Sequence, residues 1–235
     1  MTYRPIIYDW PLLAEPVNQV FLAGGTSVDG GMTIGGASVS NPEPGGRAEL
    51  RFEFAQYASE DANLAASLVM SRIMNNAVMR IKLFSPSIQL LSDAALGINT
   101  ATGVLWSNGL GWSQAPWAAD PSLPIMGGGA AKGATTFAVN LVGFLNLIKV
   151  GHVVGFHLEG YDFAHKVINV AYNTSGNRAD CTVSPPLRRA IANTDRVQFR
   201  PAMLVTCVNA REVAASYRLG RTIAMNAARF VEALV

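Results

Sequence analysis

The feature that most limits how this chain can fold is a run of short alternating segments within residues 147–201. Apolar and polar residues alternate in each segment, which is the period of a half-buried β-strand. Turn sequences rich in Gly and Asn separate the segments, and these residue types reach positive φ at low cost. The pattern predicts a β-meander with strands at residues 150–158, 163–172, 179–184 and 196–200.

A corner follows the third of these segments. Pro185 and Pro186 cannot donate to a strand ladder, and consecutive prolines force an extended bend. Arg188 comes directly after the bend and the leucine that follows it. We expect Pro185, Pro186 and Arg188 to form a structural corner.

A strand–helix–strand unit is expected between residues 47 and 84. Residues 47–54 alternate strictly, as a strand with one wet face does. A helix is predicted at about 59–76, because an N-capping serine and two acidic residues precede apolar residues at helical spacing. Leu64 and Leu68 are expected to widen its apolar stripe, and residues 78–84 form the second strand.

The glycine-rich segment 127–133 is the expected domain boundary, because Gly-rich sequence is typical of a flexible connection. We expect an N-terminal β domain over residues 1–126, with the helix and a Trp-rich loop. Residues 127–235 form a β-meander that either completes the same barrel or makes a second β domain. The glycine-rich residues 1–46 contain turns between short strands, and an arm that reaches a neighbouring subunit fits them as well.

Three of the four tryptophans, Trp106, Trp112 and Trp117, fall in a segment rich in Gly, Ser and Asn. Aromatic rings in loops stack on sugar faces, so one interpretation is a glycan-binding platform. Tryptophan is also enriched at buried contact sites, so the other is an ordered loop that packs on the barrel or on an adjacent subunit. The three residues are candidate subunit-interface or glycan contacts.

The chain carries little charge, and that charge is uneven. Charged residues make up 14% of the chain, against roughly 25% in typical soluble domains. A subunit that hides surface against neighbours fits this figure, and so does a chain simply rich in Ala, Val and Gly. Residues 1–177 have a net charge of −3 and residues 178–235 of +5. These charges are either solvated strand faces or a basic part that meets an acidic surface on the next subunit.

No pattern of nucleophile, base or metal ligands is present. In strand alternation His152 and His157 point to opposite faces, which disfavours a metal site with His165. Cys181 shares its strand face with apolar neighbours and is expected in the core, although pairing with Cys207 stays open. We therefore expect no enzyme: no catalytic, cofactor-binding or metal-binding residues, and no cofactor.

Neither a membrane span nor a signal peptide is expected. The longest apolar region, residues 137–156, is interrupted by polar residues. The N-terminus lacks a hydrophobic signal core. Arginines are scattered rather than concentrated on one helix, which disfavours specific nucleic-acid recognition.

Three stretches resemble a known family. They read HKVINV at residues 165–170, CTVSPPLRRAIANTDRVQF at 181–199 and FVEAL at 230–234. Together they resemble the distal tail proteins of long-tailed bacteriophages (siphoviruses) and gene transfer agents. The resemblance favours strands over helices in part of residues 213–234, where Ala content alone leaves both open.

The resemblance implies a mainly β fold: a sandwich or barrel of the tail-tube-like type with one flanking α-helix. It implies a virion protein, made in the host cytoplasm, that forms a hexameric ring at the tail tip or baseplate. This ring would join the tail tube protein to the tail hub, with DNA passing through it. The alternatives are another minor tail or tube protein and a carbohydrate-binding adhesion module.

Overall fold

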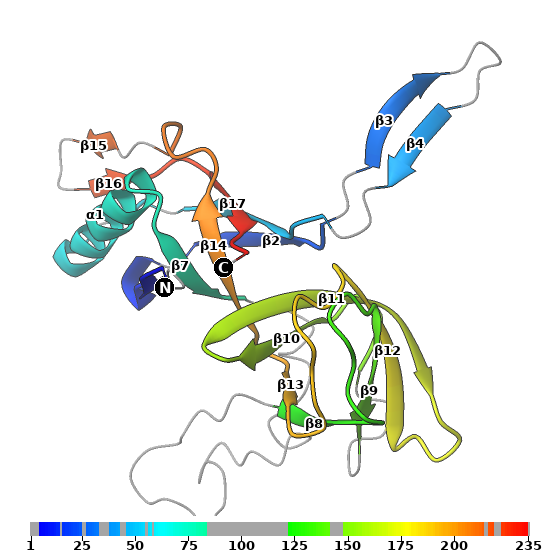
Figure 1. The fold of residues 1–235 in the computed structure, drawn as a ribbon. Helices are drawn as coiled ribbons and strands as arrows, with labels where there is room; N and C mark the ends of the chain where they lie inside the picture. The colour runs from blue at the N-terminus through cyan, green and yellow to red at the C-terminus, as the bar shows by residue number, and fades with distance from the viewer. Residues whose placement is uncertain are drawn as a thin grey trace, which may run out of the picture. The chain divides into compact units, whose positions relative to one another are not determined.

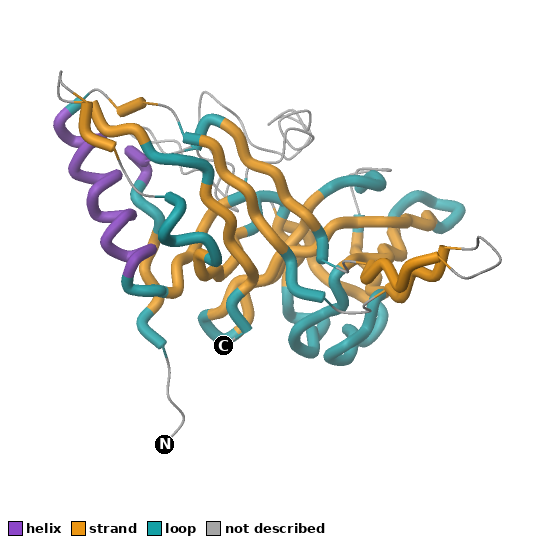
Figure 2. The backbone as a smooth tube through the Cα atoms, turned by 90° about the horizontal axis from the view of Figure 1, so that it is seen from above, coloured by secondary structure: helices purple, strands orange, loops and turns teal. Residues whose placement is uncertain are grey.

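The computed structural model describes residues 5–14, 16–24, 27–32, 38–42, 46–54, 56–57, 59–83, 122–141, 148–213, 216–218 and 222–234. Within these residues the protein is mainly β with one α-helix, as the sequence predicts (Figures 1 and 2). The chain forms two compact units. Unit 1 comprises residues 1–83, 159–163 and 202–235, and unit 2 comprises residues 84–158 and 164–201.

A six-stranded sheet forms the centre of unit 1. Its strands, in spatial order, are β1 (Ile7–Asp9), β7 (Val78–Lys82), β14 (Ala202–Cys207), β17 (Ala228–Glu232), β5 (Glu49–Glu53) and β2 (Asn18–Leu22). β1 and β7 are parallel, and the other neighbouring pairs are antiparallel. Gln19 of β2 donates its side-chain amide to the carbonyl of Lys82 on β7, at 3.3 Å. Three strands lie between β2 and β7 in the sheet, so this contact requires strong curvature.

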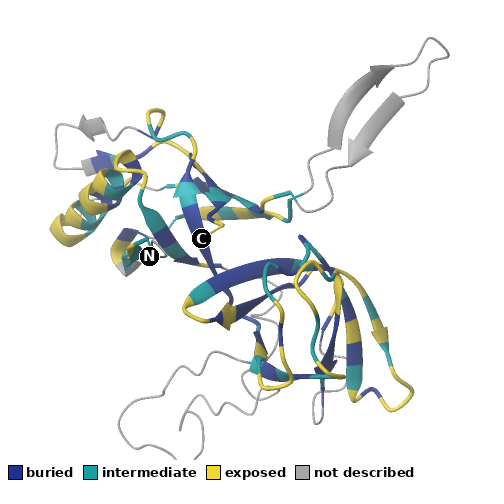
Figure 3. Ribbon diagram, viewed as in Figure 1, coloured by how far each residue is buried: buried dark blue, intermediate teal, exposed yellow. Residues whose placement is uncertain are grey.

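One face of this sheet carries the core of unit 1. Leu50 and Phe52 are fully buried on β5, whereas the alternating charged residues of that strand face outward. Figure 3 shows buried residues on the strands of both units. The ring of Trp10 lies 5.5 Å from that of Phe52 and 5.8 Å from that of Phe230, both edge-on. Burying each phenylalanine stabilises the fold by about 1.5–3 kcal/mol, which makes this cluster a main contributor.

The predicted helix is confirmed as α1 (Glu60–Met74). Ser59 caps it, because its hydroxyl accepts a hydrogen bond from the backbone N–H of Ala62. Its buried residues are Ala66, Val69 and Ile73. The helix contacts the 3-10 turn η1 (Leu12–Ala14), β6 (Gln56–Tyr57) and β16 (Thr222–Ala224).

The prediction for Leu64 and Leu68 is wrong. Their side chains do not widen the buried stripe but are 64% and 45% exposed. They lie two positions to either side of Ala66, and a helix turns by about 100° per residue. Both therefore project some 160° away from that buried alanine.

Two smaller sheets complete unit 1. One contains β15 (Ser216–Arg218), β16 and β6, and the other contains only β3 (Ser27–Met32) and β4 (Ser38–Pro42). The described parts of the C-terminal segment contain the strands β15, β16 and β17 and no helix.

Unit 2 contains a closed six-stranded barrel. Its strands, in spatial order, are β10 (Val153–Leu158), β11 (Tyr161–Tyr172), β12 (Arg178–Ser184), β9 (Thr136–Asn140), β8 (Ser122–Met126) and β13 (Arg196–Gln198). The four predicted meander strands are confirmed here as β10 to β13, and the first residues of β11 group with unit 1. The interior is filled by apolar side chains, with the rings of Phe137 and Phe156 at 5.2 Å.

The two units are not consecutive in the chain. β7 ends at Lys82 and β14 begins at Ala202, and these two residues are paired in the sheet of unit 1. In the sequence, the whole of unit 2 therefore lies between two neighbouring strands of unit 1. The expected boundary between residues 126 and 127 differs from this division, because β8 before it pairs with β9 after it.

The glycine-rich segment 127–133 connects β8 to β9 and is fixed by backbone contacts rather than acting as a flexible linker. Ala130 and Ile191 exchange both backbone hydrogen bonds, at 2.9 and 2.8 Å. Gly129 has a φ of +82°, and a Cβ at this position would lie 2.0 Å from the carbonyl oxygen of Ile191. Only glycine allows this approach of the two segments.

Candidate functional site

The tryptophan candidates Trp106, Trp112 and Trp117 lie outside the described residues, so their role stays a prediction. Trp10 is the remaining tryptophan, and it belongs to the core cluster of unit 1. Its indole N–H donates to the carbonyl of Ala14 at 2.9 Å.

The corner residues lie in the connection between β12 and β13. The Ser184–Pro185 peptide bond is cis. His165 Nδ1 and the carbonyl oxygen of Pro185 are 2.8 Å apart, so the imidazole N–H donates to that carbonyl. Leu187 is buried, whereas Arg188 is half-buried.

The histidines and cysteines do not form a reactive cluster. His152 and His165 are buried, whereas His157 is exposed. Cys181 and Cys207 are both free thiols, in units 2 and 1 respectively. Burial raises the pKa of Cys181 to about 12 and also raises that of Cys207, so both thiols are protonated and poorly nucleophilic at neutral pH. Across the described ranges, no group of three or more His, Cys, Asp or Glu residues could hold a metal ion.

His152 is held in its neutral form. Burial, and to a smaller extent the charge of Lys149, lowers its pKa. The backbone N–H of Lys149 donates to His152 Nδ1 at 3.3 Å. Protonation at Nδ1 would remove this acceptor, so the local structure favours the uncharged ring.

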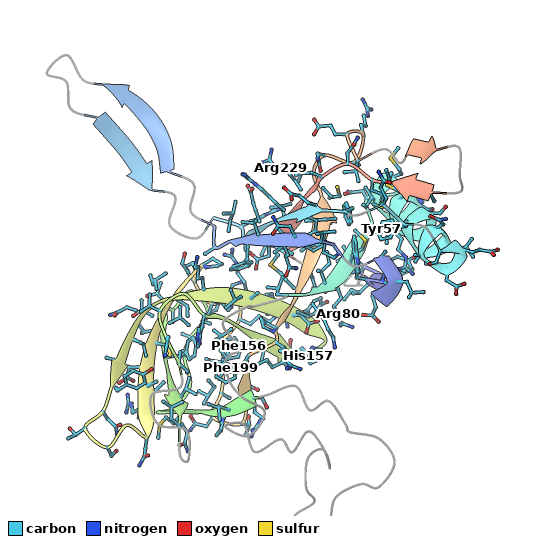
Figure 4. The ribbon with its side chains drawn as sticks, turned by 180° about the vertical axis from the view of Figure 1, so that it is seen from behind. Tyr57, Arg80, Phe156, His157, Phe199 and Arg229 are labelled. Carbon is cyan, nitrogen blue, oxygen red and sulfur yellow. The ribbon has the colours of Figure 1, made fainter. Side chains whose placement is uncertain are left out.

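Arg80 of β7 joins three parts of unit 1 (Figure 4). Its Nε donates to Asp162 at 2.6 Å, and its Nη1 donates to Asp9 at 3.1 Å. Nη2 donates to the carbonyl of Gly160 at 3.2 Å, in the turn that precedes β11. Burial acts to lower the pKa of Arg80, but the hydrogen bonds and charges of Asp162 and Asp9 outweigh it and raise that pKa. Asp162 is only 5% exposed, so this ion pair fixes the turn 159–163 on the sheet.

The β3–β4 hairpin is the first candidate assembly element. Among the described strands, β3 and β4 pair only with each other. They lie between β2 and β5, which are themselves paired at Leu22 and Glu49. An isolated two-stranded hairpin is marginally stable at best in water, so this ribbon requires additional contacts.

The edge strand β2 is the second candidate assembly element. In the described sheet it pairs with β5 alone. Its sequence, NQVFL, has neither the charges nor the proline that commonly protect an edge from pairing. Val20 and Leu22 are 42% and 37% exposed on its outward face.

The outward sheet face beside β2 brings like charges together. Arg51 on β5 lies between Val20 of β2 and Arg229 of β17 in the strand register. Arg229 also forms an ion pair with Glu49, at 3.6 Å. Like charges directly opposite each other on adjacent strands are destabilising, and the ion pair of Arg229 with Glu49 offsets part of this repulsion.

The outward face of α1 is the third candidate assembly element, and the sequence analysis missed it. Leu64 and Leu68 are one turn apart and therefore adjacent on the helix surface. Their angular distance from Ala66, Val69 and Ile73 could have placed them there from the sequence. Their apolar character alone favours a position in the core, which is why they were expected there.

None of the described helical segments combines the length and the apolar character that a membrane-spanning helix needs. Comparison of the chain with protein-family models and with curated proteins gives no match.

Proposed function

We propose that the protein is a structural subunit of a phage or phage-like tail, which assembles as a hexameric ring between the tail tube and the tail hub. The β3–β4 hairpin carries this proposal, because in the described sheets it pairs with no other strand. A neighbouring copy would supply the contacts that this ribbon requires. The unprotected edge of β2 would offer further pairing.

The fold of unit 1 supports a tail-tube-like assignment within this proposal. Its six-stranded sheet curves until Gln19 of β2 reaches Lys82 of β7, and α1 flanks the strands. The resemblance to distal tail proteins implies a sandwich or barrel with one flanking helix, and a curved sheet flanked by a helix is compatible with that fold. In the virion tail, the partners would be further copies of the chain, the tube protein and the hub protein, with DNA passing through the ring.

Removal of the hairpin tests the proposal. A Cβ at Gly24 would lie 2.3 Å from the carbonyl oxygen of Gly46, so the backbones at the two ends of the segment are already adjacent. Residues 25–45 can therefore be replaced by an Asn-Gly turn without separating β2 from β5. We expect the natural chain to give about six times the monomer mass by light scattering, and rings by negative-stain microscopy. The shortened chain should be monomeric with an unchanged unfolding temperature.

A control variant replaces only residues 33–37 by Gly and Ser and so keeps both strands of the hairpin. It should form the same ring as the natural chain. A natural chain that stays monomeric and forms no rings would contradict the proposed function. Rings that persist in the shortened chain would contradict the role of the hairpin.

A further inference from the structure

The two units differ in charge, which the division of the sequence at residue 177 does not reveal. Unit 2 contains eight Lys and Arg against four Asp and Glu, a net charge of +4. Unit 1 contains ten against twelve, a net charge of −2. The positive charge of the protein is therefore concentrated on the unit that contains the small closed barrel.

Several of these cations gather at one end of the barrel. The β8–β9 connection, residues 127–135, lies beside the β12–β13 connection, residues 185–195. Hydrogen bonds join Ala130 to Ile191, and further bonds of 2.8 and 2.9 Å join Gly133 and Ala134 to Leu187. The cations that these segments carry are Lys132, Arg188 and Arg189.

Lys166 lies at the same end of the barrel. It is paired with Ser184, the last residue of β12 before the corner. We call Lys132, Lys166, Arg188 and Arg189 the basic rim. Lys132 is exposed, and the other three side chains are half-buried.

The two connections contain one acidic residue, Asp195. Its carboxylate accepts a hydrogen bond from the backbone N–H of Ala192 at 2.7 Å, which fixes it within its own turn. The rim and the two connections together contain four cations and one carboxylate, and unit 2 as a whole has a net charge of +4, which attracts anions to this unit.

The backbone that carries the two arginines is fixed on both sides. Leu187 is 2% exposed and Ile191 is 4% exposed, so each anchors one end of the short segment between them. The hydrogen bond between His165 and the Pro185 carbonyl fixes the chain just before this segment. A fixed backbone lowers the entropy that the chain loses when Arg188 and Arg189 bind a ligand.

We propose that the basic rim binds the phosphodiester backbone of an anionic polymer. A guanidinium group binds two phosphate oxygens at once in a bidentate contact, and each lysine adds a point charge. Cations spread over two adjacent connections and a strand end match repeating anions better than a single ion. Nucleic acid and phosphate-linked cell-surface polymers share this chemistry, and recognition of the backbone needs no base-specific contacts.

The test measures binding of the full chain to fluorescein-labelled single-stranded DNA, double-stranded DNA and poly(glycerol phosphate) by fluorescence anisotropy. Titrations run from about 50 to about 200 mM NaCl, where phosphate contacts give a steep salt dependence. The rim variant is Arg188→Gln with Arg189→Gln. The matched control, Lys149→Gln with Arg200→Gln, removes the same charge from exposed residues of unit 2. Lys149 precedes β10 and Arg200 follows β13, so both lie toward the other end of the barrel.

We expect the rim variant to bind about tenfold or more weakly at the lowest salt, and its salt slope for single-stranded DNA to fall by roughly 1.4. The control should lose less than about threefold. Binding to all three polymers would identify the phosphodiester backbone as the ligand, and binding to DNA alone would identify nucleic acid as its source. Both results support the proposal.

Three results would overturn it. Equal weakening in the two variants would mean that only net charge matters. Absence of binding to all three polymers would exclude the ligand class. A change in oligomer mass in the rim variant, measured on the same sample, would instead make the rim a contact between copies. Loss of polymer binding with an intact ring leaves the proposed function untouched, so the two proposals fail independently.

Discussion

Among single residues, His152 couples the stability of unit 2 to pH. Its pKa is lowered in the folded protein, so below about 6.5 the unfolded chain binds more protons than the folded one. Its contribution to stability is therefore complete above that pH and is lost as the pH falls through the lowered pKa. We expect the free energy of unfolding to fall with a slope of up to about 1.4 kcal/mol per pH unit in this window.

Urea denaturation at pH 7.5, 6.5, 5.5 and 5.0 measures this dependence. His152→Asn keeps a side-chain acceptor near the Lys149 N–H but cannot titrate, so its stability should fall less steeply over the same range. His157→Asn, on the exposed side of β10, is the matched control and should follow the natural chain. Parallel curves for the natural chain and His152→Asn would contradict the prediction.

Arg80 is the residue on which the turn 159–163 depends. Arg80→Ala leaves the buried carboxylate of Asp162 without the cation that binds it at 2.6 Å. We expect this change to lower the free energy of unfolding by about 2–4 kcal/mol, because an uncompensated buried charge is costly. Adding Asp162→Asn should restore part of the loss, since it removes that charge.

Chemical denaturation of the three variants measures this effect. Arg51→Ala removes an exposed arginine from the same sheet and should change stability by no more than about 0.5 kcal/mol. Arg80→Ala with a cost as small as that of Arg51→Ala would show that the ion pair contributes little.

At the scale of elements, the two faces of α1 should contribute differently to the stability of the fold. Leu64→Gln with Leu68→Gln changes side chains that are already exposed, so we expect the free energy of unfolding to change by about 0.5 kcal/mol or less per residue. Ile73→Ala on the buried face should cost about 2–4 kcal/mol, because it leaves a cavity.

Thermal and urea unfolding of the two variants test this assignment. A destabilisation by the double Leu variant as large as that by Ile73→Ala would mean that the outward leucines are packed within the same chain. An unchanged stability together with a smaller oligomer mass would place them in a contact between copies.

The local elements were predictable because their signals are local. The capping serine and apolar spacing give α1, and alternation gives four of the six strands of the barrel, β10 to β13. The outward orientation of Leu64 and Leu68 also follows from the sequence. It requires the angle of each residue around the helix axis, which apolar character alone does not give. The prediction that segment 127–133 is a flexible connection differs from the structure for another reason. The glycines of this segment serve a close backbone approach to Ile191, and composition cannot distinguish that role from flexibility.

At the scale of the whole molecule, the pairing of distant strands was beyond the sequence. Nothing in the composition of β7 and β14 indicates that Lys82 is the partner of Ala202, because their pairing spans the whole of unit 2. The difference in net charge follows the division into the two units, which are not consecutive in the sequence. A count of charges along the chain therefore placed the change at residue 177 instead. The candidate site was predictable only as a tendency to associate, from low charge and strand edges.

The insertion of unit 2 between β7 and β14 has a consequence for the order of folding during synthesis. The ribosome makes β5 and β7 before unit 2, but β14 and β17, which lie between them in the sheet, follow only after unit 2. All residues of unit 2 have been synthesised before β14, so this unit is free to fold first. The unit that is begun first is therefore finished last, and the apolar face around Phe52 must stay protected on the nascent chain until β14 and β17 emerge.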